Sequence, residues 1–167
     1  MNKEIYQAAR DYAQRGLAVF PVKKNKHPYT MHGVKDATTD LTVIREWWKR
    51  WPDANIGIAT GTVSGGLIVI DQDIDDGTGV NGVISFQKWC REKNVKEPDS
   101  WLAITGRGGY HLYLKSAHAS EFKNSVALLE GVDIRADGGY VIAPPSVHQN
   151  GRAYTWEYPP DEYQLET

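Results

Sequence analysis

Apolar residues recur with a helical period in two stretches near the amino terminus. The first, residues 3–15, is followed by Gly16, a residue type that suits the end of a helix. Its apolar stripe is Ile5, Ala8, Ala9, Tyr12 and Ala13. The second stretch begins after Asp40, a residue type favoured at helix N-caps. Its stripe is Ile44, Trp47, Trp48 and Trp51, a spacing that favours packing against a sheet over the alternative of a platform for stacking bases.

The remaining apolar segments are short runs rich in β-branched and aromatic residues and interrupted by glycine, which predicts strands. Residues 17–22 form the first such run. The later runs are NIGIATG, GLIVID, WLAITG, YHLYL, GVDIRA and GYVIAPPS, and a helical pattern at residues 85–93 interrupts them. We therefore expect an α+β fold around one sheet. We expect a single compact domain over residues 1–158, with residues 159–167 as a tail or the start of a linker.

Composition and charge narrow the class of protein. A chain of 167 residues with 41% hydrophobic and 24% charged residues is typical of one globular domain. The net charge of −2 provides no global basic field, so any contact with nucleic acid is expected to be local. The single cysteine, Cys90, excludes a disulfide framework and a multi-cysteine zinc site. We see no signal peptide and no membrane span, so a cytoplasmic protein without a membrane partner is expected.

The run GLIVIDQDIDDG, residues 66–77, takes an apolar strand directly into four carboxylates. Asp71 and Asp73 are two residues apart, so on a strand their side chains point to the same face. Carboxylates at that spacing suit a pair of divalent cations of the kind used in phosphoryl transfer. The alternative is a solvated strand end followed by an acidic turn, an interpretation that fits Asp75 and Asp76 better.

A third acid lies inside the apolar alternation of GVDIRADGG. Because a carboxylate in such surroundings needs compensation, Asp133 is expected to be paired or to bind a ligand. Arg135 lies on the same strand face and is the candidate partner for pairing. If Asp133 binds metal instead, it adds the third anionic group that two metal ions carrying a triphosphate require.

The segment TGRGGYHLYL, residues 105–114, joins two predicted strands through a turn of three glycines and an arginine. Backbone N–H groups in such a turn can approach an anion closely. His111 begins the second strand and shares a face with Tyr113. A lone histidine in a strand is more often a hydrogen-bonded structural residue, but a neighbouring anion-binding turn weakens that preference.

Three other sequence patterns are weaker evidence for a functional site. GTGVNG, residues 77–82, matches a dinucleotide-binding glycine pattern, but the acids before it would repel a pyrophosphate. Ser146 and His148 share a strand face, yet no oxyanion loop accompanies them as a nucleophile and base. Lys26 belongs to a basic cluster that is most simply a solvated loop, with a phosphate-binding role as the alternative.

Taken together, the order of these pieces resembles the bifunctional DNA primase/polymerase domain of the archaeo-eukaryotic primase superfamily, which occurs in replication proteins of phages, plasmids and integrated elements. The resemblance runs over residues 6–156. It rests on GLAVFPVKKNKHP, ATTDLTVIREWWKRWPDANIGIATG, GLIVIDQD, ITGRGGYHLYL, GVDIRADGGYVIAPPS and GRAYTWE. It implies an RRM-like sheet that carries the catalytic acids, packed with an amino-terminal αβ unit.

The resemblance also implies roles for particular residues. Asp71, Asp73 and Asp133 would bind two Mg²⁺ or Mn²⁺ ions, and His111 would contact the phosphates of the incoming nucleotide; these four are the catalytic set. The residues expected around the nucleotide are Lys26, Thr105, Arg107, Gly108, Arg135, Ser146 and His148.

The function implied is that of a metal-dependent nucleotidyltransferase, a DNA primase and/or DNA polymerase that acts in the replication of a mobile element. Its partners would be ribo- or deoxyribonucleoside triphosphates, a single-stranded DNA template, and a helicase or accessory primase segment in this or another chain. The alternatives are a non-catalytic nucleotide- or nucleic-acid-binding module and a metal-dependent phosphohydrolase. The set of three acids and a histidine favours the enzyme, while the low net charge predicts weak template binding by charge alone.

Overall fold

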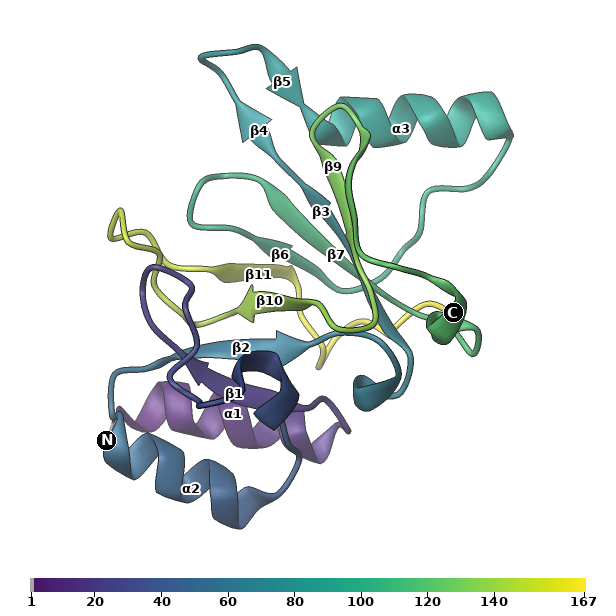
Figure 1. Ribbon diagram of the computed structural model, residues 1–167. Coiled ribbons are helices and arrows are strands. Elements are labelled where there is room, and N and C mark those ends of the chain that lie inside the picture. The colour runs from purple at the N-terminus through teal and green to yellow at the C-terminus, as the bar shows by residue number, and fades with distance from the viewer. Residues whose placement is uncertain (1) are drawn as a thin grey trace.

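The computed structural model describes residues 2–167 and has three α-helices in that range (Figure 1). Each helix begins with a side-chain cap. These helices are α1 (Lys3–Gln14), α2 (Leu41–Arg50) and α3 (Gly82–Lys93). Asn2 Oδ1 accepts hydrogen bonds from the first turn of α1, and Asp40 Oδ1 accepts one from Thr42 N at 2.7 Å. The cap at Asp40 was predicted and is confirmed. The third helix begins three residues earlier than expected, because Asn81 Oδ1 caps it through Ile84 N at 3.1 Å.

The largest sheet has six strands in the order β11-β6-β7-β3-β9-β8, and every neighbouring pair is antiparallel. Its strands are β3 (Leu67–Gln72), β6 (Leu102–Ile104), β7 (Tyr110–Lys115), β8 (Ser125–Leu129), β9 (Val132–Arg135) and β11 (Thr155–Tyr158). Strand β3 lies between β7 and β9 near the middle of the sheet. The sequence pattern had not singled out β8 or β11, and β8 is an edge strand on which Val126 and Leu128 are exposed.

A second sheet of three antiparallel strands has the order β1-β2-β10. It consists of β1 (Val19–Val22), β2 (Asn55–Ala59) and β10 (Tyr140–Ala143), and a small hairpin is formed by β4 (Ile74–Asp75) and β5 (Val80–Asn81). The expectation of one sheet was therefore wrong. The physical reason is that β10 pairs with β2, far away in the sequence, instead of extending the sheet beyond β9.

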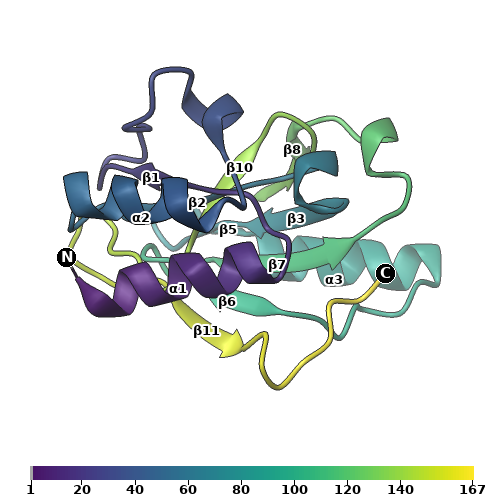
Figure 2. The same cartoon turned by 90° about the horizontal axis from the view of Figure 1, so that it is seen from below.

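The hydrophobic core divides along β3, whose two faces are both buried. Leu67 and Val69 pack into a cluster with α1, α2 and the three-stranded sheet. Ile68 and Ile70 point the other way, into a smaller cluster that Phe86 of α3 helps to cover. Figures 1 and 2 show the resulting arrangement, with α1 and α2 side by side against the three-stranded sheet and α3 beyond the six-stranded sheet.

Residues 159–167 contact the rest of the chain through backbone and side-chain hydrogen bonds. Trp101 Nε1 donates to Tyr163 O at 2.7 Å, and Lys115 N donates to Glu166 O at 2.8 Å. The division at residue 158 stays a prediction. Among the described residues, no helix has the length and apolar character needed to cross a membrane.

Candidate active site

Three neighbouring strands place His111, Asp71 and Asp133 in one row across the six-stranded sheet. Asp71 of β3 is the register partner of His111 on β7 and of Asp133 on β9. Directly opposed residues of antiparallel strands project from the same face, so the three side chains gather on one side. The sequence predicted each residue as a candidate, and the strand register brings them together.

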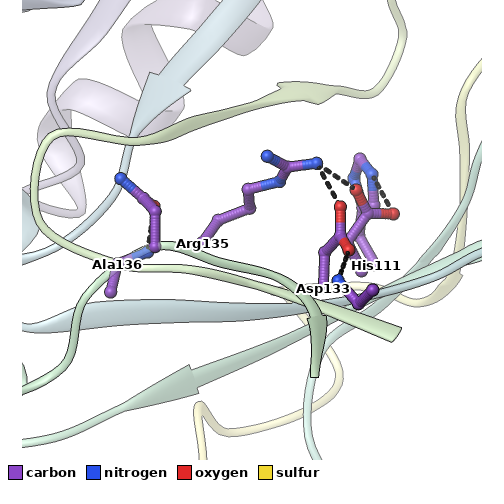
Figure 3. A network of polar contacts seen from close by, with 7 residues as sticks. His111, Asp133, Arg135 and Ala136 are labelled. Atoms are coloured by element: carbon purple, nitrogen blue, oxygen red, sulfur yellow. Dashed lines mark hydrogen bonds and ion pairs between the residues drawn. The ribbon is translucent and has the colours of Figure 1, made fainter. Parts of the chain in front are cut away.

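Arg135 contacts both carboxylates of this row and offsets part of their charge. It lies two residues after Asp133 on β9, so its side chain shares the same face. Its Nη2 donates to Asp133 Oδ2 at 2.8 Å and to Asp71 Oδ2 at 3.3 Å (Figure 3). Asp133 Oδ1 also accepts a hydrogen bond from Ala127 N at 2.8 Å. Of the two alternatives for Asp133, pairing or ligand binding, the structure shows the pairing with Arg135, and the same guanidinium also contacts Asp71.

His111 is buried beside Asp71, with its Nε2 atom 3.4 Å from Asp71 Oδ1. The other ring nitrogen, Nδ1, is buried without a hydrogen-bond partner among residues 2–167. The hydroxyl of Tyr113, on the same strand face, is also buried and unpartnered within that range. Buried polar atoms nearly always have a hydrogen-bond partner. These two atoms therefore have hydrogen-bonding capacity that the described residues leave unused.

Burial and nearby charges shift the pKa values of groups in and beside the row. Burial alone would raise the pKa of Asp71, but the contact with His111 and the charge of Arg135 outweigh it and lower that pKa. Tyr154 lies close by, and burial together with the negative charge of Asp71 raises the pKa of its hydroxyl to about 12. Asp71 is therefore ionised at neutral pH, and Tyr154 keeps its proton.

A cavity of about 360 Å³ opens beside the row, between the two sheets. It brings together four predicted residues, which are Lys26, Asp71, His111 and Arg135. Its other walls are Asn124, Gly138, Gly139, Tyr140, Val141, Ile142 and Tyr154. Lys26 lies in the loop after β1, and its carbonyl oxygen accepts a hydrogen bond from the Tyr140 hydroxyl at 2.8 Å.

Asp73 lies one residue beyond the end of β3, and its side chain is exposed. Its backbone N donates to Gly131 O at 2.8 Å, whereas its carboxylate has no hydrogen bond or ion pair within residues 2–167. Partial desolvation and the charge of Asp71 raise the pKa of Asp73, although Arg107 acts in the opposite direction. Asp73 is thus within electrostatic reach of the row and is not part of its contacts.

The predicted anion-binding turn is a tight connection between β6 and β7. Thr105 N donates to Gly109 O at 2.8 Å, and Gly108, with φ 92°, donates to Thr105 O at 2.9 Å. Arg107 projects from this turn and is exposed. A Cβ on Gly109 would lie 2.4 Å from Gln72 O, so this glycine allows the turn to approach the end of β3.

Ser146 and His148 form hydrogen bonds that stabilise the fold, and they do not line the cavity. Ser146 is fully buried, and its hydroxyl oxygen accepts a hydrogen bond from Ile56 N at 2.8 Å. His148 Nδ1 accepts from Asn150 N at 3.2 Å, and Asn150 Nδ2 donates to Gly106 O at 2.9 Å. These contacts fix the segment after β10 against β2 and against the β6–β7 turn.

The cavity also contains side chains that sequence reasoning did not propose. Tyr140, Tyr154 and Asn124 line it, and Asn124 Oδ1 accepts a hydrogen bond from Ala136 N at 2.8 Å. Tyr140 begins a segment that the sequence did identify as a strand. The alternation of apolar residues in this strand does not show that the strand lies across the cavity from Asp71. That position follows from the pairing of β10 with β2, which is far away in the sequence.

The donor chemistry of the row suits a hard divalent cation, since carboxylate oxygens are the ligands that Mg²⁺ and Mn²⁺ prefer. Asp71 and Asp133 already direct one oxygen each at a single positive group. Within residues 2–167, no group of three or more histidine, cysteine, aspartate or glutamate side chains is arranged to hold a metal ion. A cation bound by these two carboxylates must therefore compete with Arg135, and the metal-binding roles of all three acids stay predictions.

Comparison with known proteins gives one family. The family model described as bifunctional DNA primase/polymerase, N-terminal, matches residues 9–165. The matched range contains the whole row, the cavity lining and the β6–β7 turn. No curated protein matches the chain.

Proposed function

Because this chain belongs to the bifunctional DNA primase/polymerase family, we propose that it is a metal-dependent nucleotidyltransferase, a DNA primase and/or DNA polymerase. Its substrates would be nucleoside triphosphates and a single-stranded DNA template. The replication of a phage, plasmid or integrated element is the setting that the proposal implies. The row of His111, Asp71 and Asp133, with the cavity beside it, would be the active site.

One observation of the site carries the proposal: the strand register places two carboxylates and a buried histidine in one row beside a cavity that can hold a small molecule. A polyanionic triphosphate would be repelled by Asp71 and Asp133 without a compensating cation. When bound, Mg²⁺ or Mn²⁺ would neutralise the transferring phosphate and orient the attacking 3′-hydroxyl. Asp71, Asp133 and Asp73 are the residues that would hold these ions.

The other cavity residues would position the nucleotide. Lys26, in the loop after β1, and Arg135, on β9, carry positive charge at the cavity wall and are suited to phosphate oxygens. His111, oriented by Asp71, would donate a hydrogen bond to a phosphate. Val141 and Ile142 are also part of the lining, and its apolar portion would contact the base or sugar.

The proposal is tested by incorporation of labelled ribo- and deoxyribonucleotides on single-stranded DNA with Mg²⁺ or Mn²⁺, with and without a primer. Asp71→Asn keeps the shape of the side chain and removes its charge. We expect it to lower incorporation by at least about 100-fold, the order of loss seen when an electrostatic group of an active site is removed. Asp76→Asn, in the exposed acidic turn, is the matched control and should retain activity. Full activity of Asp71→Asn would exclude the row as the catalytic site.

A second candidate is a non-catalytic nucleotide-binding module, and the pairing of both acids with Arg135 favours it. Arg135 offsets one of the two negative charges and Lys26 at the cavity wall adds a second positive charge, so a site of this kind could bind an anion without any metal. Calorimetry separates the two candidates, since the enzyme should bind nucleotide more tightly with Mg²⁺ or Mn²⁺. Nucleotide binding that ignores metal, with no pyrophosphate released and no strand growth, would favour the module.

A further inference from the structure

The tryptophan stripe of α2 is divided by the structure between the core and the surface. Ile44 and Trp48 are fully buried, as core packing requires. Trp47 and Trp51 are only partly buried. Core packing therefore accounts for Ile44 and Trp48, whereas Trp47 and Trp51 are exposed enough for the alternative of a stacking platform.

Trp51 belongs to a group of two stacked aromatic rings, each contacted by one cation, which we call the aromatic–basic column and define as Lys23, Tyr29, Trp51 and Arg50. The rings of Tyr29 and Trp51 are stacked, with centroids 5.0 Å apart and planes inclined by 22°. Lys23 Nζ lies 5.4 Å from the Tyr29 centroid, and Arg50 Cζ lies 4.9 Å from the Trp51 centroid. Both cations are exposed.

A hollow of about 420 Å³ adjoins this column. Its lining includes the rings of Tyr29, Trp47 and Trp51 together with Met31, whose side chain is 90% exposed. The carboxylate in this lining, Asp36, already accepts hydrogen bonds from His32. The hollow thus offers flat apolar surfaces beside cations, a combination that suits an unpaired base and its phosphates.

The charge of the segment that carries the column differs from that of the chain as a whole. Residues 23–53 contain seven lysines and arginines against four aspartates and glutamates, whereas the whole chain has 19 against 21. The column therefore lies on a segment with an excess of positive residues in a chain that is slightly negative overall. Such an excess favours strand binding, since phosphate neutralisation supplies most non-specific affinity.

The column is connected to the catalytic cavity by a short, well-fixed hairpin. Lys23 N donates to His27 O at 2.8 Å, and Lys26 N donates to Lys23 O at 2.9 Å. Lys26, at the tip of this turn, lines the cavity, while Tyr29, after it, belongs to the column. Figure 2 shows the segment between β1 and α2 standing out beside α2, where a strand could reach it.

We propose that the aromatic–basic column and its hollow bind the unpaired DNA template, and that residues 23–29 lead this strand toward the catalytic cavity. A base stacks on a ring face in place of Lys23 or Arg50, and the displaced cation pairs with the neighbouring phosphate. This inference names a partner surface for the proposed function and rests on it for the direction of the strand.

Strand binding is measured by fluorescence anisotropy of a labelled oligothymidylate titrated with the protein, over a series of salt concentrations. Tyr29→Leu removes a stacking ring and should weaken binding by about tenfold or more. Arg50→Gln should weaken binding and reduce the slope of log affinity against log salt by about 0.7, the value for one phosphate contact on a single strand. Tyr29→Phe keeps the ring and should bind like the natural protein, which separates stacking from a folding defect.

The matched controls are an aromatic residue and an arginine on other elements, Tyr158→Leu and Arg91→Gln, both at exposed positions. They should leave strand affinity and the salt slope unchanged. No binding of the oligonucleotide by the natural protein would overturn the inference. Losses in the controls equal to those of Tyr29→Leu and Arg50→Gln would overturn it as well, because binding would then be diffuse.

Different experimental results would reject the template-binding surface and the proposed enzyme activity. Asp71→Asn should keep strand binding while losing incorporation, whereas Tyr29→Leu should raise the template concentration needed for half-maximal incorporation and leave the maximal rate intact. Strand binding through the column without any incorporation would reject the enzyme and support the surface. Incorporation with unchanged strand binding in Tyr29→Leu and Arg50→Gln would reject the surface alone.

Discussion

Replacing Arg135 by glutamine tests how the acids of the row are held together. The guanidinium bridges Asp71 and Asp133, whose side chains are only 16% and 17% exposed. Removing one partner of a fully buried ion pair costs about 3–5 kcal/mol, because a charge is left without compensation. Arg135 is itself 31% exposed, and the glutamine amide can still donate to one carboxylate. We therefore expect Arg135→Gln to lower the free energy of unfolding by about 2 kcal/mol, the size of one charged hydrogen bond.

A divalent cation should reverse part of this loss. With the guanidinium gone, Mg²⁺ or Mn²⁺ no longer competes with Arg135 for the two carboxylates. A cation at about ten times its dissociation constant stabilises the folded state by about 1.4 kcal/mol. The natural protein should gain less under the same conditions, since its acids are already paired.

Urea unfolding followed by tryptophan fluorescence, with EDTA or with Mg²⁺, measures both effects. Arg15→Gln is the control, since Arg15 forms an exposed ion pair with Asp161. Its loss should cost no more than about 1 kcal/mol and should not respond to the cation. Equal stability of Arg135→Gln and the natural protein in EDTA would refute the bridging role. A destabilised Arg135→Gln that gains no more from Mg²⁺ than the natural protein would refute cation binding by the two carboxylates.

Two further substitutions examine the packing around the site. Gly109→Ala should lower the free energy of unfolding by about 1–3 kcal/mol, because its Cβ would meet Gln72 O at 2.4 Å; an unchanged melting temperature would contradict this close approach. Tyr113→Phe should raise the free energy of unfolding by about 1 kcal/mol, since it removes a buried hydroxyl without a partner in the described chain. Destabilisation of Tyr113→Phe in thermal unfolding would instead indicate that a buried water satisfies the hydroxyl.

Local pattern was enough to predict most of the elements. The apolar stripe before Gly16 and the cap at Asp40 were read directly, because helix formation depends on residues within one or two turns. The strand carrying Asp71 and the strand carrying Asp133 were also identified, and with them the acids of the row. The family followed from the order of these pieces, and the family model bears it out.

The sequence by itself thus determined the helices, most strands, the α+β class and the family, since these depend on short-range periodicity and on the identity of residues along the chain. Only the tertiary structure decided that β10 joins β2, that Asp71 faces both His111 and Asp133, and that Lys26 lines their cavity. Backbone hydrogen bonds are the same for every residue, so an apolar alternation does not specify which distant strand it pairs with or in which register. Register is chosen by the packing of the whole core, and it is register that turns scattered acids into a site.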